Sequence, residues 1–240
     1  MFTRITRNRC ALGLGSVLLV FALFPIQRAQ ANLLTDPGFE SNPLLPGVGV
    51  LTNIPGNAGT WGTENANIVG AVGAVSPAAG SSMLQMLDDG LAATQGWQAI
   101  NVSAYAAQID AGLVTYTASA LYNVESSVPA ASASTGMFFI DSTGVWGNNS
   151  GPFSSSNLTL DNNPSTWQTI TNSGTVPVGT RWMIIQVAYT NSTLLGNAGV
   201  VEAGYVDSAR VELNSVPLPP AVLAGAAMLG VVSLRRSRLA

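Results

Sequence analysis

Histidine and lysine are absent from the 240-residue sequence, and its one cysteine, Cys10, lies close to the N-terminus. A Ser-His nucleophile, a Schiff-base lysine and nearly every zinc site need one of these residues. The absences argue against most enzyme classes and leave paired carboxylates, as glycosidases use them, as the remaining catalytic route. The one adjacent acidic pair, Asp88-Asp89, precedes Gly90 and is typical of a turn.

Positive charge is nearly missing from the middle of the chain. All nine basic residues are arginines, and only Arg181 and Arg210 lie between residues 32 and 214, whereas all 12 acidic residues lie there. This region therefore carries a formal charge of −10, although the whole chain carries −3. Such a surface repels nucleic acid and anionic lipid headgroups and can attract divalent cations. A role of the acidity in solubility alone is an equal alternative.

The N-terminus has the three parts of a secretory signal peptide. Arg4, Arg7 and Arg9 precede an apolar stretch over residues 11–24, and small residues follow at Ala29-Gln30-Ala31. We expect a signal peptide over residues 1–31, cleaved after Ala31. A lipoprotein cysteine would follow the apolar stretch, whereas Cys10 precedes it, so a lipid anchor is disfavoured.

The C-terminus has a Pro-rich entry, an apolar run over residues 221–234 and a basic end. The 14-residue run would be about 21 Å long as a helix, against a hydrocarbon core of roughly 30 Å. Basic residues retained on the cytoplasmic side would leave everything before residue 216 outside, the topology that the signal peptide also predicts. An ordinary permanent membrane anchor is the alternative to a sorting signal.

Residues 215–240 resemble a PEP-CTERM sorting segment of Gram-negative bacteria. Val216, Pro217 and Pro219 match its Val-Pro-x-Pro motif, with Leu218 in place of the name-giving Glu, and Arg235 with Arg236 matches its terminal cluster. The resemblance covers about a tenth of the chain. It implies export to the cell envelope, outer surface or extracellular matrix, processing by an exosortase, and association with exopolysaccharide.

Residues 32–214 read as one all-β domain. Residues 114–124 alternate apolar and polar side chains with a period of two, which predicts a strand. Further strands are predicted at 82–87, 97–102, 137–141, 167–174, 181–190 and 205–213, and the stretch 43–77 reads as irregular with one or two strands. Seven or more short strands in about 180 residues favour a β-sandwich.

The domain resembles galactose-binding-like jelly rolls, the fold of many carbohydrate-binding modules. Residues 32–40 are similar to the opening strand and turn of that fold, residues 167–169 and 178–180 to its later strands, and residues 204–207 to its closing Gly-Tyr-x-Asp-Asp strand. Ser208 stands at the second Asp of the closing pattern. The resemblance implies a jelly-roll sandwich and sugar binding.

A carboxylate falls on the expected core side of the last strand, because alternation places Asp207 on one face with Tyr205, Ala209, Val211 and Leu213. A buried charge needs a partner, and Ca²⁺ takes carboxylate and carbonyl oxygens.

In the resembled fold a structural calcium often ties the first turn to the last strand, which implies a calcium site at Glu40 and Asp207. A salt bridge from Asp207 to Arg210 or Arg181, or a position of Asp207 at an exposed strand end, are the alternatives.

Tryptophans are the candidate sugar-stacking residues, because an aromatic face packs on the C–H face of a pyranose while amides bind its hydroxyls. Trp146 and then Trp61 are the best candidates, since both lie in Gly-rich loops. Core packing or loop anchoring is an equal alternative for both. Trp167 and Trp182 begin strands and are expected to be structural.

The sequence thus favours an exported, non-catalytic sandwich that binds extracellular polysaccharide. A structural matrix or surface component without a specific ligand is the first alternative. A carboxylate-dependent enzyme acting on polysaccharide is the second.

Overall fold

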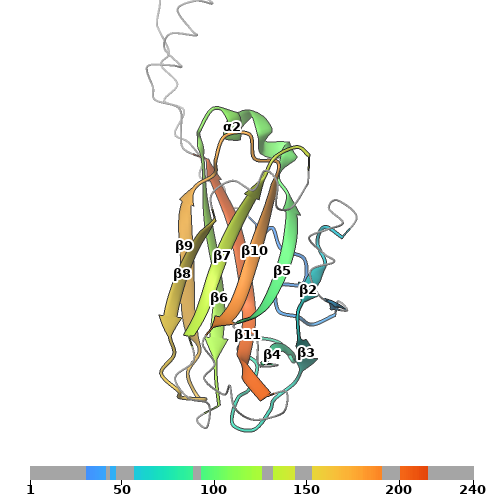
Figure 1. Cartoon of the computed structure of the whole chain (residues 1–240), viewed down its shortest axis with the longest axis vertical. Helices are drawn as coiled ribbons and strands as arrows, with labels where there is room; N and C mark the ends of the chain where they lie inside the picture. The colour runs from blue at the N-terminus through green and yellow to red at the C-terminus, as the bar shows by residue number, and fades with distance from the viewer. Residues whose placement is uncertain are drawn as a thin grey trace, which may run out of the picture.

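A computed structural model describes residues 31–41, 44–46, 57–88, 93–125, 132–143, 153–190 and 201–215. Within these residues, eleven strands form two sheets that pack face to face (Figure 1). Sheet A contains, in spatial order, β1 (Leu45–Pro46), β2 (Trp61–Thr63), β5 (Ala93–Asn101), β10 (Trp182–Thr190), β7 (Ser132–Ile140) and β8 (Ser154–Thr159). Sheet B contains β3 (Ala66–Val69), β4 (Met83–Asp88), β11 (Val201–Ser215), β6 (Val114–Asn123) and β9 (Gln168–Thr175).

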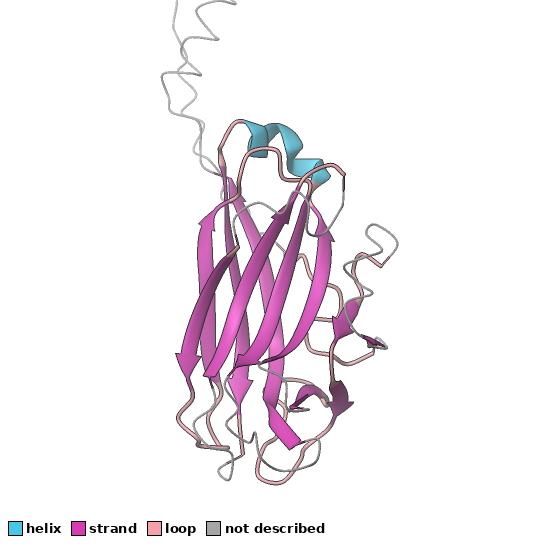
Figure 2. Ribbon diagram, viewed as in Figure 1, coloured by secondary structure: helices cyan, strands magenta, loops and turns pink. Residues whose placement is uncertain are grey.

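The connectivity is that of a jelly roll. From β4 to β7 successive strands alternate between the two sheets, and β8 to β11 do the same, so that most neighbours within a sheet are distant in sequence. All pairings are antiparallel except the short β1–β2 contact. The all-β sandwich predicted from the sequence is therefore confirmed. A short helical segment, η1 (Ser103–Tyr105) followed by α2 (Ala106–Asp110), caps one end of the sandwich (Figure 2).

The main core lies between the sheets and is formed by alternate residues of each strand. In β6, Val114, Tyr116, Ala118, Ala120 and Tyr122 point into it, as the period-two pattern predicted. Strand β10 differs because every residue from Trp182 to Tyr189 is buried. Its two faces belong to two separate apolar clusters, one between the sheets and one on the outer side of sheet A.

The predicted strands all occur, with bounds shifted by one or two residues, except that β7 begins five residues earlier than expected and β5 and β11 each begin four residues earlier. The short strands β1 to β3 lie in the stretch predicted to be irregular, and β8 was not predicted. The predicted signal peptide, apart from its last residue, and the predicted C-terminal run lie outside the described residues. Within the described ranges, no helix has the length and apolarity needed to cross a membrane.

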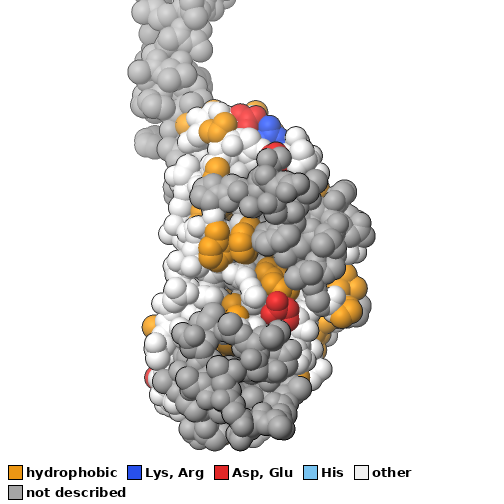
Figure 3. Space-filling view, viewed as in Figure 1, with side chains coloured by type: hydrophobic (Ala, Val, Ile, Leu, Met, Phe, Trp, Pro, Cys, Tyr) orange, Lys and Arg blue, Asp and Glu red, His pale blue; other side chains and the backbone are white. Residues whose placement is uncertain are grey.

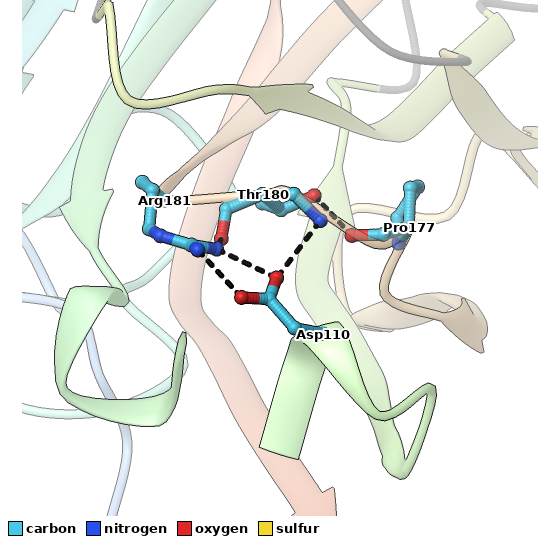
Figure 4. Close-up of polar contacts among 5 residues, drawn as sticks. Asp110, Pro177, Thr180 and Arg181 are labelled. Carbon is cyan, nitrogen blue, oxygen red and sulfur yellow. Dashed lines mark hydrogen bonds and ion pairs between the residues drawn. The ribbon is translucent and has the colours of Figure 1, made fainter. Parts of the chain in front are cut away.

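An ion pair fixes the turn before β10 to the end of α2 (Figure 4). Arg181 donates from Nη2 and Nη1 to the two carboxylate oxygens of Asp110, at 2.7 and 3.0 Å. The backbone N–H of Gly179 also donates to Asp110 Oδ1 at 3.2 Å, and Thr180 Oγ1 closes the turn by donating to Pro177 O at 2.6 Å. Asp110 therefore holds both the arginine and the turn that precedes it.

This pair predicts a pH-dependent contribution to stability. The hydrogen bond from Arg181, supported by that from Gly179, lowers the pKa of the Asp110 carboxyl. A carboxyl with a lowered folded-state pKa stabilises the fold above its unfolded pKa, near 3.9, and this contribution disappears as the pH falls through the folded-state value. We expect Asp110→Asn to lower the free energy of unfolding at pH 7, with a difference from wild type that shrinks toward pH 2, measured by urea denaturation.

The matched control is the same substitution in an Arg181→Met background, where we expect Asp110→Asn to cost much less at pH 7. A loss of stability that is equal at both pH values would contradict the ion pair as its source.

Candidate functional site

A bulge in β11 decides which way its carboxylate points. The pairing of β11 with β6 shifts register between Asp207 and Arg210, and Ser208 has a φ of 49°. Val211 and Leu213 therefore pair with the inward residues of β6, whereas Asp207 pairs with Leu121, outside the core cluster. The prediction that Asp207 shares a face with Ala209, Val211 and Leu213 was wrong, because the bulge interrupts the alternation.

Asp207 is nevertheless buried, with 0% of its surface exposed, and Ala78 and Ala79 of the loop before β4 lie against its carboxylate. Its Oδ2 accepts the backbone N–H groups of Ala78 and Ala79 at 2.8 and 3.0 Å, and its Oδ1 accepts that of Ser208 at 2.5 Å. Burial raises the pKa of this carboxyl, and the hydrogen bonds from Ala79, Ser208 and Ala78 oppose the rise. The ionised form is thus held by backbone dipoles in a site that disfavours charge.

Glu40 binds the same loop from the other side. Its carboxylate accepts the backbone N–H groups of Ser81 and Ser82 at 3.0 and 3.2 Å and the Ser81 hydroxyl at 2.8 Å. These bonds, that of the Ser81 hydroxyl foremost, lower the pKa of Glu40. Gly80, at a φ of 66°, permits this approach, because a Cβ there would collide with the Glu40 carboxylate.

The structure brings the two predicted calcium ligands together at Gly38. A Cβ on this glycine would lie 3.7 Å from Asp207 Oδ1 and 3.9 Å from Glu40 Oε1. Beside it opens a pocket of about 330 Å³, lined by Gly38, Glu40, Gly80, Ser208 and Arg210 among others. In the described part of the chain, no cluster of three or more acidic, histidine or cysteine side chains is arranged to hold a metal. Any cation here would rely on these two carboxylates and on backbone carbonyls.

Strained backbone surrounds this pair. Asp36 and Phe39 have backbone φ values of 48° and 59°, which residues other than glycine rarely adopt. Two contacts hold this turn in place: the Asp36 carboxylate accepts the backbone N–H of Glu40 at 2.7 Å, and Phe39 packs on Trp61 with ring centroids 4.9 Å apart. The surrounding fold thus imposes the conformation that aims Glu40 at the loop.

Both alternatives for Asp207 are contradicted. Arg181 pairs with Asp110, and Arg210 pairs with Glu212, so both arginines have other partners. An exposed strand end is ruled out by the complete burial of Asp207. The same burial argues against a catalytic pair with Glu40, since Asp207 could not reach a bond in the adjacent pocket.

A second candidate site lies on the outer face of sheet A. An apolar cluster occupies this face at the end of the sheet near α2, and it consists of Trp97, Ala99, Ile140, Trp182 and Ile184, with Leu45, Ala58 and Phe138 packed against them. Most outer faces of antiparallel sandwiches are polar. The five cluster residues are themselves buried, although Figure 3 shows some hydrophobic side chains at the surface in the middle of this side of the molecule.

An aromatic pair rests on a glycine beside this cluster. Gly136 faces outward between Gln186 and Ser155 of the neighbouring strands. A Cβ at Gly136 would lie 2.7 Å from the Phe153 ring, so only glycine allows that ring to lie against the sheet. Phe153 stacks on Phe138 with ring centroids 4.3 Å apart and planes inclined by 29°, yet 48% of its surface is exposed. One ring is thus supported from below and open to solvent.

Polar groups extend from this ring across the sheet. Gln186 donates its side-chain amide to that of Gln95, and Gln95 donates in turn toward the Glu64 carboxylate at 3.4 Å. Gln186 pairs across the sheet with both Trp97 and Gly136. The outer face therefore combines aromatic surface with a row of amide and carboxylate groups, the two kinds of group that a saccharide contacts.

The described tryptophans have packing roles. Trp61 is a core residue with 1% of its surface exposed, and its indole N–H donates to Asp36 O at 3.0 Å, so the structure favours core packing over sugar stacking there. Trp167 packs against a small cluster and donates to Ser76 O, as expected of a structural residue. Trp146 lies outside the described residues.

The residues of the outer face were missed by the sequence analysis. Phe153 follows a Gly-Pro pair and precedes a Ser-rich strand that alternates only weakly, so no pattern singled it out. The one sequence signal for Phe153 is an aromatic residue placed between a Gly-Pro turn and a polar strand.

Comparison with known proteins finds similarity of shape alone. No protein-family model matches the sequence, and no curated protein matches it. Among solved structures, the C-terminal family 22 carbohydrate binding module of Clostridium thermocellum Xyn10B is 13% identical, with a TM-score of 0.43 over 69% of this chain and 92% of that module. The CBM22-1 xylan-binding domain of Paenibacillus barcinonensis Xyn10C is also 13% identical, with a TM-score of 0.45 over 79% of this chain and 99% of that domain. At such identities and TM-scores, these similarities do not define a ligand for this chain.

Proposed function

We propose that this protein is a non-catalytic polysaccharide-binding protein, and that the outer face of sheet A holds the sugar. The observation that carries the proposal is the Phe153 ring, exposed to solvent and supported by Phe138 and Gly136, with the Gln186–Gln95 amides beside it. A pyranose stacked on the phenyl ring would place its hydroxyls within reach of side-chain amides. Trp146, in the same connection between β7 and β8, is proposed as a second stacking residue.

The alternative is a matrix or surface component without a specific ligand. It would leave the exposed ring and the amide row without a function, whereas exposed large hydrophobic side chains are rare in the described part of this molecule. A carboxylate-dependent enzyme ranks below both. Glycosidases need two acids on either side of the scissile bond, and the carboxylates that the structure brings together, Glu40 and Asp207, are committed to backbone N–H groups.

Loss of the ring is expected to weaken binding. With soluble neutral polysaccharides as the panel in affinity gels, Phe153→Ala and Trp146→Ala should each reduce the affinity about tenfold, because each removes a stacking surface worth more than 1 kcal/mol. Val178→Ala is the matched control, since it truncates the other exposed large hydrophobic side chain and should leave retention unchanged. Failure of the wild-type chain to be retarded by any polysaccharide would contradict the proposal and favour the matrix role.

A structural calcium ion between Glu40 and Asp207 is a second proposal. The two carboxylates are far apart in the sequence but both lie near Gly38. Residues with positive φ values, Phe39 beside Glu40 and Ser208 beside Asp207, direct them there. The buried Asp207 carboxylate has a raised pKa, so its charge opposes folding above that pKa, and a divalent cation would offset this cost. The backbone N–H groups that already bind both carboxylates are the competing explanation for their position.

Calcium is expected to raise the melting temperature relative to chelator. At a concentration a hundredfold above the dissociation constant, the gain would be about 2.7 kcal/mol, or roughly 5 to 10 °C for a domain of this size. Asp207→Asn should abolish the shift, whereas Glu64→Gln should retain it. Identical melting curves with calcium and chelator would contradict the calcium site and leave hydrogen bonds within the protein to explain the position of both carboxylates.

Export and sorting form the third part of the proposal. The arginine-flanked apolar stretch before Ala31 and the Val-Pro-x-Pro segment with its apolar run support an exported domain, handled at the membrane by an exosortase-type enzyme in a Gram-negative bacterium. The charge of −10 between the two segments suits an extracellular polysaccharide matrix better than contact with nucleic acid.

Mass spectrometry of the C-terminus from the native cells tests this sorting. We expect the chain to end between Val216 and Pro220 after processing, and to begin at Asn32. Substituting Pro217→Ala together with Pro219→Ala should leave the tail attached, with no change in the N-terminus. An intact Arg238-Leu239-Ala240 end in the wild-type chain would instead indicate a permanent membrane anchor.

A further inference from the structure

The last strand ends beside the short helix and one exposed turn. Ser215, the end of β11, pairs with Val114, the first residue of β6, which follows α2 after a short turn. Val176, just before the turn over residues 177–180, donates its backbone N–H to Val114 O at 2.9 Å. The end of β11, α2 and this turn thus lie at the same end of the sandwich, the upper end in Figure 1.

The chain length beyond Ser215 limits how far this end can lie from a membrane. Five residues, Val216 to Pro220, separate it from the apolar run. They span at most about 18 Å when fully extended, and about 16 Å as the polyproline helix that three prolines favour. The headgroup layer itself takes roughly 5 to 8 Å of this distance. If the run enters a bilayer, the α2 end is therefore held within roughly 13 Å of the headgroups.

The surface at this end suits such a position. Val178, at the tip of the turn, has 67% of its surface exposed, and Ala104, Ala107 and Ala111 are exposed along the neighbouring helical segment. The turn is held in place by Asp110, through Gly179 and Arg181 (Figure 4).

Charge at this end is low for so acidic a domain. The ion pair with Arg181 neutralises Asp110. Asp141, which follows β7 at the same end, accepts the backbone N–H and hydroxyl of Thr143 and so closes its own turn. Glu125 and Asp161 follow β6 and β8 at the opposite end. An anionic headgroup layer therefore repels this end less than the rest of the surface.

We propose that the end formed by α2 and residues 177–180 faces the lipid bilayer, with Val178 at the headgroup interface. The proposal rests on the sorting given under the proposed function and concerns the chain before processing, while residues 221–234 are inserted in the membrane. Strands would then stand upright on the membrane, and the outer face of sheet A would point sideways, open to polymer chains that run along the surface. Asp110 acts as a positioning residue, because it fixes the turn that carries Val178.

The test uses the exported chain with its tail retained, residues 32–240, which contains no cysteine, reconstituted into vesicles of phosphatidylethanolamine and phosphatidylglycerol. An environment-sensitive fluorophore is attached to Val178→Cys or, as the matched control, to Ser165→Cys in an exposed turn at the opposite end of the sandwich. We expect iodide to quench the label at position 178 less than the label at 165, with a blue-shifted emission at 178. Asp110→Asn should partly restore quenching at 178 and leave 165 unchanged.

The outcomes distinguish the orientation of the α2 end from the membrane insertion of residues 221–234. Vesicle flotation that is absent, or that survives Leu223→Arg with Leu229→Arg in the apolar run, would overturn the insertion of residues 221–234 and the orientation with it. Flotation that depends on the run, with equal quenching at both labels, would overturn the orientation alone. Shielding at 178 that grows with the protein-to-lipid ratio would assign the turn to a contact between copies of the chain and would also overturn it.

Discussion

The register of β11 is the constraint on which the rest of the structure depends. The strand lies between β4 and β6 at the centre of sheet B, and the N-terminal segment attaches to it through Asn32, whose side-chain amide contacts Ala209 O and Val211 N. The bulge after Asp207 keeps Val211 and Leu213 in the core while turning the carboxylate outward. That carboxylate then binds Ala78 and Ala79, and Ser81 and Ser82 of the same loop bind Glu40. The extra residue in β11 thus allows Asp207 to bind the loop before β4, and Glu40 of the first turn binds the same loop.

The period-two segments were predictable because each has one apolar face, and β6 shows this most clearly. The face of Asp207 was not predictable, since nothing in the sequence marks the bulge. The positive φ of Ser208, which accompanies the bulge, is visible only in the structure. The resemblance of the first turn and last strand to a known fold led to a calcium site predicted at Glu40 and Asp207. In the structure both carboxylates lie near Gly38, and the calcium ion stays a prediction. Their partners, the N–H groups of residues 78–82, could not be predicted, because backbone groups of an irregular loop carry no sequence signature.

The outer face of sheet A escaped prediction for a different physical reason. Strand β10 carries apolar residues on both faces, so its sequence reads as a nearly continuous hydrophobic run and not as an alternating one. Such a run indicates burial on two sides without telling which side faces the core. Gly136 likewise appears in sequence as a weak point in a strand, although in the structure it provides the surface on which Phe153 lies. The aromatic and amide groups come together through cross-strand register, which links residues some 90 positions apart.

The position of Ser215 at the end of a central strand also determines how the domain responds to mechanical load. Tension applied through the C-terminal tail acts along the axis of β11, which pairs antiparallel with β6 from Tyr205 to Ser215 and with β4 from Val201 to Val206. The force is then shared by many hydrogen bonds sheared at once, whereas a tether on an edge strand pulled sideways would break them one after another. A domain tethered at Ser215 in a matrix under flow would therefore resist extension through the strand that organises its fold.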